Sequence, residues 1–186
     1  AHALRSGLAL IPQESILFGG TLRFNLDPTG VHSDAEMLAS LRHVHMADEC
    51  ILRGGLDSVV AEDGENYSHG QRQLICTARA LLKGAKIVML DEATASADVE
   101  TDALLQKTFR EVLSEAGCTV LVIAHRLNTI ADSDRIMVLA NGGLAEFDTP
   151  ERLLAIPDGR YRALVAEARQ AAGSRSSGNL AALTEE

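Results

Sequence analysis

The sequence contains no apolar stretch near the roughly 20 residues needed to span a bilayer, and no secretory signal precedes its first predicted strand. We therefore expect no direct membrane insertion by this segment. Positive charge is not in excess either, because 17 Lys and Arg stand against 26 Asp and Glu, a net charge of -9. This balance argues against a broad basic surface and a nucleic-acid partner, and favours protein partners.

Cysteine is also scarce. Cys50, Cys76 and Cys118 are odd in number and lie far apart without metal-type spacing, which predicts reduced, packed thiols and no structural zinc. His43 and His45 are two residues apart and would face different directions on a helix, so a metal site there is not expected.

The loop Gly-x-x-x-x-Gly-Lys-Ser/Thr, which wraps the phosphates of a nucleotide, is missing as well. Residue 1 is Ala, and the apolar run Leu8–Ile11 predicts a strand almost at once. We therefore expect that the chain is N-terminally truncated and belongs to something longer.

Continuous apolar runs at Ile87–Leu90 and Thr119–Ala124 are typical of parallel strands buried on both faces. Val99–Leu113 between them predicts a helix, and together the three form a βαβ crossover with both strand ends on one edge of a sheet. The pattern therefore indicates an α/β fold.

The remaining elements follow from turn and capping patterns. Ser33 and Glu36 form a capping-box pattern that opens a helix, and Gly84 ends the helix that follows Ser68–Gln73. Residues 135–139 and 144–147 predict a hairpin. A last helix is predicted at Tyr161–Ala172, and the composition of residues 173–186 predicts a flexible tail.

Polar side chains follow three of the predicted strands. Gln13, the pair Asp91-Glu92 and His125 each lie just past an apolar run, at the edge where open α/β sheets bind ligands. The Asp91 carboxylate can bind Mg²⁺, and the Glu92 carboxylate can accept a proton from a water. His125 can contact negative charge that develops on a phosphate, and Gln13 offers a neutral oxygen to the metal or the water. Each also has a simpler interpretation, as a helix cap, a turn or a structural histidine.

A second motif lies on the segment Ser68-His69-Gly70-Gln71-Arg72-Gln73, a small turn that opens a helix. Such a turn presents unpaired backbone N–H groups and a positive dipole end to phosphate. Arg72, Arg79 and Lys83 recur along this helix at loose spacing, and we interpret them as solvated or paired residues, not a nucleic-acid strip.

Five ordered motifs in this sequence resemble those of ABC transporter ATPase domains. Residues 68–73 resemble the signature, 87–92 the Walker B strand, 96–98 the D-loop, 123–127 the H-loop and 11–14 the Q-loop. The segment Leu17-Phe18-Gly19-Gly20-Thr21-Leu22-Arg23-Phe24-Asn25-Leu26-Asp27-Pro28 is particularly similar to the second nucleotide-binding domain of subfamily C, the multidrug-resistance-associated type.

The resemblance implies a P-loop NTPase fold: a RecA-like parallel-sheet core over residues 1–172 with a helical signature subdomain at about 27–83. Two such domains sandwich two ATP molecules.

The resemblance also implies roles for the site residues. Asp91 and Gln13 would hold Mg²⁺, and Glu92 and His125 would be catalytic. Nucleotide contacts would further come from Gln13, Ser68, His69, Gly70, Gln71 and Asp98. Ser68 and Gly70 would face the ATP of the partner domain. His69 replaces a small residue of the family pattern and either points away or adds positive charge.

The function implied is ATP hydrolysis coupled to substrate export, on the cytoplasmic face of a membrane, with a second nucleotide-binding domain and transmembrane domains as partners. Without the phosphate-wrapping loop, the 186 residues alone are expected to be inactive. Two alternatives are a regulatory nucleotide sensor of a channel-associated ABC protein and a soluble ABC ATPase without a transport role.

Overall fold

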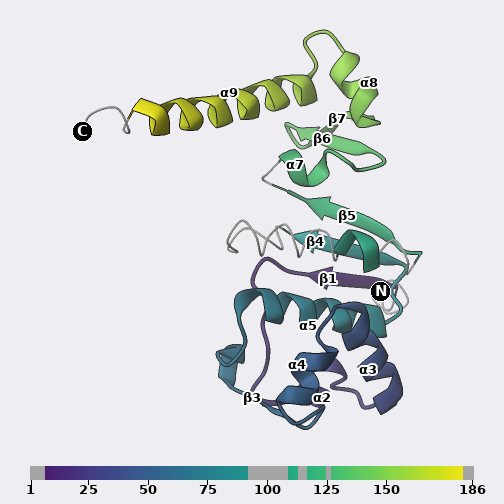
Figure 1. Ribbon diagram of the computed structural model, residues 1–186. Helices are drawn as coiled ribbons and strands as arrows, with labels where there is room; N and C mark the ends of the chain where they lie inside the picture. Colours follow the sequence, from purple (N-terminus) through teal and green to yellow (C-terminus); the bar gives the residue numbers. More distant parts are fainter. Residues whose placement is uncertain (1–6, 92–108, 113–116, 125–126, 182–186) are drawn as a thin grey trace. The chain divides into compact units, whose positions relative to one another are not determined.

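The computed structural model describes residues 7–91, 109–112, 117–124 and 127–181 (Figure 1). The chain separates into two compact units, Ala1–His125 and Arg126–Glu186. The sequence predicts one domain over residues 1–172, so the division after His125 is a feature that it does not predict.

The first unit contains a three-stranded parallel sheet in the order β1-β4-β5. Its strands are β1 (Leu8–Ile11), β4 (Ile87–Asp91) and β5 (Thr119–Ile123). All three apolar runs are therefore confirmed as strands, and β4 pairs with β5 in parallel, as predicted. The predicted helix Val99–Leu113 lies mostly outside the described residues, of which 109–112 are helical. In this arrangement the carboxyl ends of the strands meet at one edge.

Helix α5 (His69–Leu82) covers one face of the sheet (Figure 1). Side chains that alternate along the strands point toward α5 and are buried there, namely Ala9, Ile11, Val88 and Leu90. On the opposite face Leu10, Leu121 and Ile123 are exposed. Among the described residues, the buried side chains of the strands cluster with α5, Phe109, Ala85 and Cys118. The prediction of burial on both faces is therefore wrong for the opposite face, where the three side chains named above are exposed.

Short helices lie on the other side of α5 (Figure 1). They are α2 (Leu22–Leu26), α3 (Asp34–His43) and α4 (Ala47–Leu52), joined by the two-stranded pair β2 (Gly20–Thr21) and β3 (Val59–Val60) and by the 3₁₀ turn η1 (Glu62–Gly64). The Ser33–Glu36 capping box is present and opens α3, as predicted. Gly84 has a φ of 61°, which L side chains rarely adopt, so it ends α5 as predicted.

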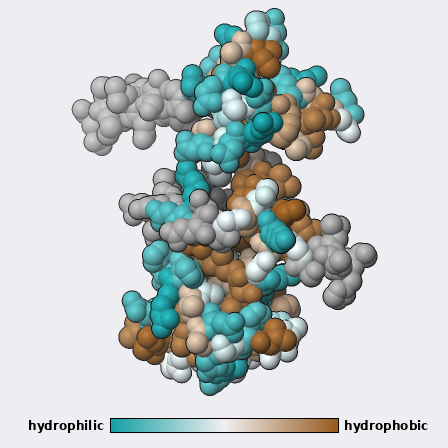
Figure 2. Space-filling model, turned by 90° about the vertical axis from the view of Figure 1, so that its right-hand side faces the viewer, coloured by the Kyte–Doolittle hydropathy of each residue, from teal (hydrophilic) through white to brown (hydrophobic). Residues whose placement is uncertain are grey.

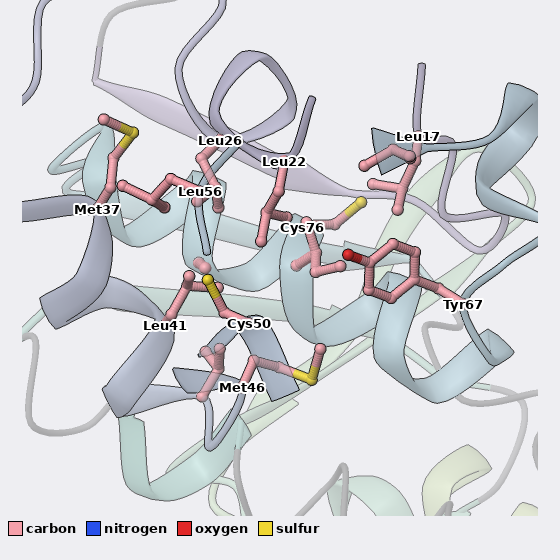
Figure 3. Packing of buried hydrophobic residues seen from close by; sticks show 14 residues of the cluster. Leu17, Leu22, Leu26, Met37, Leu41, Met46, Cys50, Leu56, Tyr67 and Cys76 are labelled. Carbon is pink, nitrogen blue, oxygen red and sulfur yellow. The ribbon is translucent and has the colours of Figure 1, made fainter. Parts of the chain in front are cut away.

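The helices enclose a hydrophobic core that is separate from the layer between α5 and the sheet (Figure 3). Ten of its side chains are labelled in the figure: Leu17, Leu22, Leu26, Met37, Leu41, Met46, Cys50, Leu56, Tyr67 and Cys76. Leu74 and Leu81 of α5 contact both layers, so α5 joins the helical part to the sheet. Cys50 and Cys76 are free, buried thiols, as predicted.

The second unit is built on the predicted hairpin. Strands β6 (Ile136–Ala140) and β7 (Gly143–Asp148) pair antiparallel, and Asn141 and Gly142 between them have φ values of 52° and 75°, as a tight hairpin turn requires. Three helices accompany them: α7 (Leu127–Ile130), α8 (Pro150–Ala155) and α9 (Arg160–Ala181). Helix α9 continues past Ala172, the predicted end, because no proline interrupts it and glycine in a helix costs only about 1 kcal/mol.

Apolar side chains also reach the surface, where they form the brown areas in Figure 2. Among the described residues, no helix combines the length and the apolar character that crossing a membrane requires.

The turn after α2 is organised by the buried carboxylate of Asp27. Its oxygens accept hydrogen bonds from the backbone N–H groups of Thr29, Gly30 and His32, and from the Thr29 hydroxyl at 2.7 Å. The His32 ring Nδ1 lies 3.0 Å from the second oxygen. Burial raises the pKa of Asp27, but hydrogen bonds from Thr29 and His32 outweigh this effect and hold the pKa well below its usual range.

Replacing Asp27 with Asn is expected to lower the free energy of unfolding by about 2 kcal/mol at pH 7, because hydrogen bonds to a charged acceptor are lost. The lowered pKa means that the carboxylate stabilises the fold above its ordinary pKa of about 3.9. This contribution disappears as the pH falls toward the folded-state pKa. Urea midpoints of the two chains should therefore differ at pH 7 and converge in acid; an equal difference at pH 7 and pH 2 would contradict this account.

Candidate functional site

Two oxygen-bearing side chains lie at the carboxyl edge of the sheet. Asp91 is the last residue of β4, and Gln13 comes two residues after Ile11, which pairs with Leu90. Gln13 is exposed and Asp91 is half-buried. Asp91 and Gln13 therefore lie at or just past the carboxyl ends of two neighbouring parallel strands, as the sequence predicts.

The other residues predicted for this edge lie outside the described residues. Glu92 follows Asp91 directly in the chain, and His125 is two residues beyond Ile123, the β5 residue that pairs with Asp91. Asp98 also lies outside the described residues. Their roles stay predictions.

The oxygen atoms at this edge fit a divalent cation of the Mg²⁺ type. Mg²⁺ prefers oxygen ligands, keeps several waters and needs only one or two protein groups, which a carboxylate from Asp91 and an amide oxygen from Gln13 would supply. In the part of the chain that the structure describes, no group of three or more His, Cys, Asp or Glu side chains could hold a metal by itself. Mg²⁺ is typically held by one or two such groups together with waters and substrate phosphates, so Asp91 and Gln13 suit a cation shared with a phosphate ligand.

The predicted phosphate-binding turn forms the start of α5. Ser68 is the N-cap, and its Oγ accepts a hydrogen bond from the backbone N–H of Gln71 at 3.2 Å. In return, Oε1 of Gln71 accepts one from the Ser68 N–H at 2.9 Å. This capping box explains why the helix begins here.

The capping box determines which groups of the turn can reach a ligand. The N–H groups of His69 and Gly70 have no acceptor within the helix, because the preceding turn does not exist. The Ser68 hydroxyl uses a lone pair for the cap and keeps its hydrogen as a donor. Three donors at the positive end of a helix thus suit an anion, whereas the Gln71 side chain serves mainly as a cap.

The His69 side chain turns inward. It is half-buried, and its Nε2 atom is enclosed without a hydrogen-bond partner among the described residues. Burial lowers the pKa of His69, and the nearby positive charge of Arg72 lowers it further. The imidazole is therefore neutral at pH 7, which favours the alternative in which this residue points away from the ligand and adds no positive charge.

Basic residues near the turn are paired, as predicted. Nη1 of Arg72 donates to the carbonyl oxygens of Tyr67 at 3.3 Å and Gly64 at 3.4 Å. Nε of Arg79 donates to the Asn25 carbonyl at 2.6 Å, and Nζ of Lys83 to that of Leu8. These guanidinium and ammonium groups thus hold backbone carbonyl oxygens of neighbouring segments.

An α/β nucleotide-binding domain is the class that this fold and site define. The family described as ABC transporter matches residues 1–95. The chain belongs to this ABC transporter family, and the resemblance seen in the five motifs is confirmed. The fold is accordingly that of a P-loop NTPase, and domains of this family bind ATP, generally with Mg²⁺.

The most similar relatives include several subfamily C proteins. The chain is 53% identical to ABC transporter C family member 3 of Dictyostelium discoideum over 165 residues, covering 88% of this chain and 12% of the relative. It is 51% identical to multidrug resistance protein mrp-7 of Caenorhabditis elegans over 170 residues, covering 91% and 11%. With ATP-binding cassette sub-family C member 4 of Mus musculus the identity is 47% over 185 residues, covering 99% and 13%.

A solved structure shows the same fold. The structure of a bacterial Atm1-family ABC exporter with ATP bound superimposes with a TM-score of 0.76 at 39% identity, covering 89% of this chain and 29% of the exporter chain. The present chain spans 11–13% of the length of the three curated relatives named above.

Proposed function

We propose that this chain is part of a nucleotide-binding domain of an ABC exporter of the multidrug-resistance-associated type, which binds and hydrolyses ATP to drive transport. The observation that carries the proposal is the sheet edge, where Asp91 ends β4 and Gln13 follows the neighbouring strand. Family membership and the ATP-bound relative support it.

In this proposal the residues of the sheet edge act on the domain's own ATP. Asp91 and Gln13 would hold Mg²⁺, which when bound neutralises negative charge on the phosphates. Glu92 accepts a proton from the attacking water, and His125 contacts the γ-phosphate. Asp98 lies in the D-loop and contributes to the same nucleotide interface.

The turn Ser68–Gln71 serves a different ATP molecule, held by a second nucleotide-binding domain. Its backbone donors at His69 and Gly70 and the Ser68 hydroxyl face the γ-phosphate of that ATP. The partners are thus a second nucleotide-binding domain, on the same polypeptide or another, and the transmembrane domains of the transporter. The domain would work at the cytoplasmic face of a membrane, where ATP joins the two domains and hydrolysis releases them.

Removal of Mg²⁺ tests this function. The complete protein, purified into proteoliposomes, is expected to hydrolyse ATP with Mg²⁺ and to fall to the background rate when EDTA is in excess, because the phosphate charges are then not neutralised. Added Mg²⁺ should restore the rate. ATP-driven uptake of a fluorescent dye into inverted vesicles should follow the same pattern; hydrolysis that persists in EDTA, or none with Mg²⁺, would refute the proposal.

A further inference from the structure

The turn that presents Ser68 rests on a side chain from a different helix. Arg53 follows the last residue of α4, and its guanidinium carbon lies 4.3 Å from the centroid of the Tyr67 ring. Its Nη1 donates to the carbonyl oxygen of Asn66 at 2.9 Å, and its Nε donates to Oε1 of Glu49 at 2.6 Å. Arg53 thus links α4 to the two residues that precede Ser68.

Asn66 also forms side-chain hydrogen bonds to strand β3 and the residue that follows it. Its Oδ1 accepts a hydrogen bond from the Ala61 N–H at 3.0 Å, and its Nδ2 donates to the Val59 carbonyl at 2.9 Å. The backbone oxygen that Arg53 contacts therefore belongs to a residue whose side chain is already fixed. Because the Asn66 side chain is held by these hydrogen bonds, a change in the position of Arg53 would change the position of the turn.

Tyr67 is the connection between this support and the turn. Its ring is 3% exposed and belongs to the helical core, as Figure 3 shows, while its hydroxyl has no hydrogen-bond partner among the described residues. Packing and the guanidinium contact therefore hold the ring in place. Because Tyr67 directly precedes the N-cap, its position determines where the Ser68 hydroxyl and the first N–H groups of α5 point.

The opposite side of the turn leaves little room for adjustment. Gly64 has a φ of 68°, and a Cβ placed there would lie 3.0 Å from atoms of both Arg72 and Leu17. Arg72 also bonds the Tyr67 carbonyl from within α5. The turn is therefore held between Arg72 on its own helix and Arg53 on α4.

We infer that Arg53 is a positioning residue, which through Asn66 and Tyr67 orients the Ser68–Gly70 donors toward the ATP of the partner domain. The inference rests on the proposed function. An arginine is required, because a planar guanidinium can stack on the ring and donate to a carbonyl at once, whereas a lysine ammonium cannot combine the two. The Ser68–Gly70 donors, once oriented by this support, contribute to catalysis only when the two domains close around ATP.

The test compares Arg53→Met with Arg42→Met, a matched change of an exposed arginine on α3, in the complete protein. Arg53→Met is expected to reduce kcat for ATP hydrolysis about tenfold, as expected for loss of about 1.4 kcal/mol of transition-state stabilisation. Binding of a photoreactive ATP analogue at 4 °C, before domain closure, should match that of the unchanged protein. Arg42→Met should leave both quantities unchanged.

Arg53→Lys serves as the second variant. It keeps a positive charge beside Glu49 and is expected to keep the fold. The kcat of Arg53→Lys should fall nearly as far as that of Arg53→Met. The inference is overturned if Arg53→Met turns over normally, if lysine restores full turnover, or if ATP binding and thermal midpoint fall in proportion to kcat. Absence of ATP hydrolysis by the unchanged protein would instead overturn the proposed function, so the two failures are distinguishable.

Discussion

Replacement of Glu92 by Gln in the complete protein should reduce ATP turnover by about 10²–10⁴-fold, the range of a lost general base. Glutamine has the same shape but accepts no proton from the attacking water. ATP binding should persist, because the residues proposed to hold Mg²⁺ and phosphate are unchanged. Single-turnover hydrolysis of labelled ATP, together with the amount of intact ATP retained after gel filtration, measures both effects.

The control for this change is Glu151→Gln, an exposed carboxylate in the first turn of α8. It should keep normal turnover. The same pair of variants separates an exporter from a regulatory sensor, because transport by an exporter stops with Glu92→Gln, whereas the output of a sensor needs only bound nucleotide. Turnover by Glu92→Gln within a factor of about three of the unchanged protein would exclude Glu92 as the base, since a general base contributes far more.

The strands and their common edge could be predicted from the sequence because they depend on local patterns. Continuous apolar runs such as Thr119–Ala124 indicate strands, and a helix-length connection forces parallel pairing. The capping box at Ser33 and Glu36 is likewise a local pattern. That at Ser68 and Gln71 has the same spacing, Ser-x-x-Gln, and would have shown that the Gln71 side chain caps the helix.

The supports of the site could not be predicted in this way, because they depend on contacts between distant segments. Nothing in the sequence joins Arg53 to Tyr67, or Arg79 to Asn25, until the helices pack around their common core. The inward orientation of His69 depends on the same packing. Residue types alone leave open whether a basic or polar side chain meets solvent, a ligand or a backbone carbonyl.

Asn25 is such a residue, and its replacement by Asp is expected to destabilise the first unit by about 3–5 kcal/mol. The side chain is 1% exposed. Its Oδ1 accepts from the Phe18 N–H at 2.8 Å, while Nδ2 donates to the carbonyl oxygens of Phe18 at 2.8 Å and Thr21 at 3.0 Å. Aspartate places a charged oxygen against two carbonyl oxygens and removes both donors.

The effect should depend on pH in a defined direction. Repulsion from the two carbonyls favours the protonated form of the new carboxyl, so its pKa in the folded chain is raised above the unfolded value of about 3.9. The Asn25→Asp chain should therefore be most stable below that value and lose stability as the pH rises through the raised pKa. The nearby guanidinium of Arg79, 3.3 Å from Oδ1, reduces the repulsion without replacing the lost donors.

Urea unfolding followed by circular dichroism, with hydrogen exchange of residues 17–27, measures this loss and assigns it to the turn around Asn25. Asn141→Asp is the matched control, since Asn141 is exposed in the hairpin turn at a φ of 52° that both residues tolerate. It should change the free energy of unfolding by no more than about 0.5 kcal/mol. Equal effects of the two substitutions would show that Asn25 does not hold the segment from Phe18 to Thr21 in place.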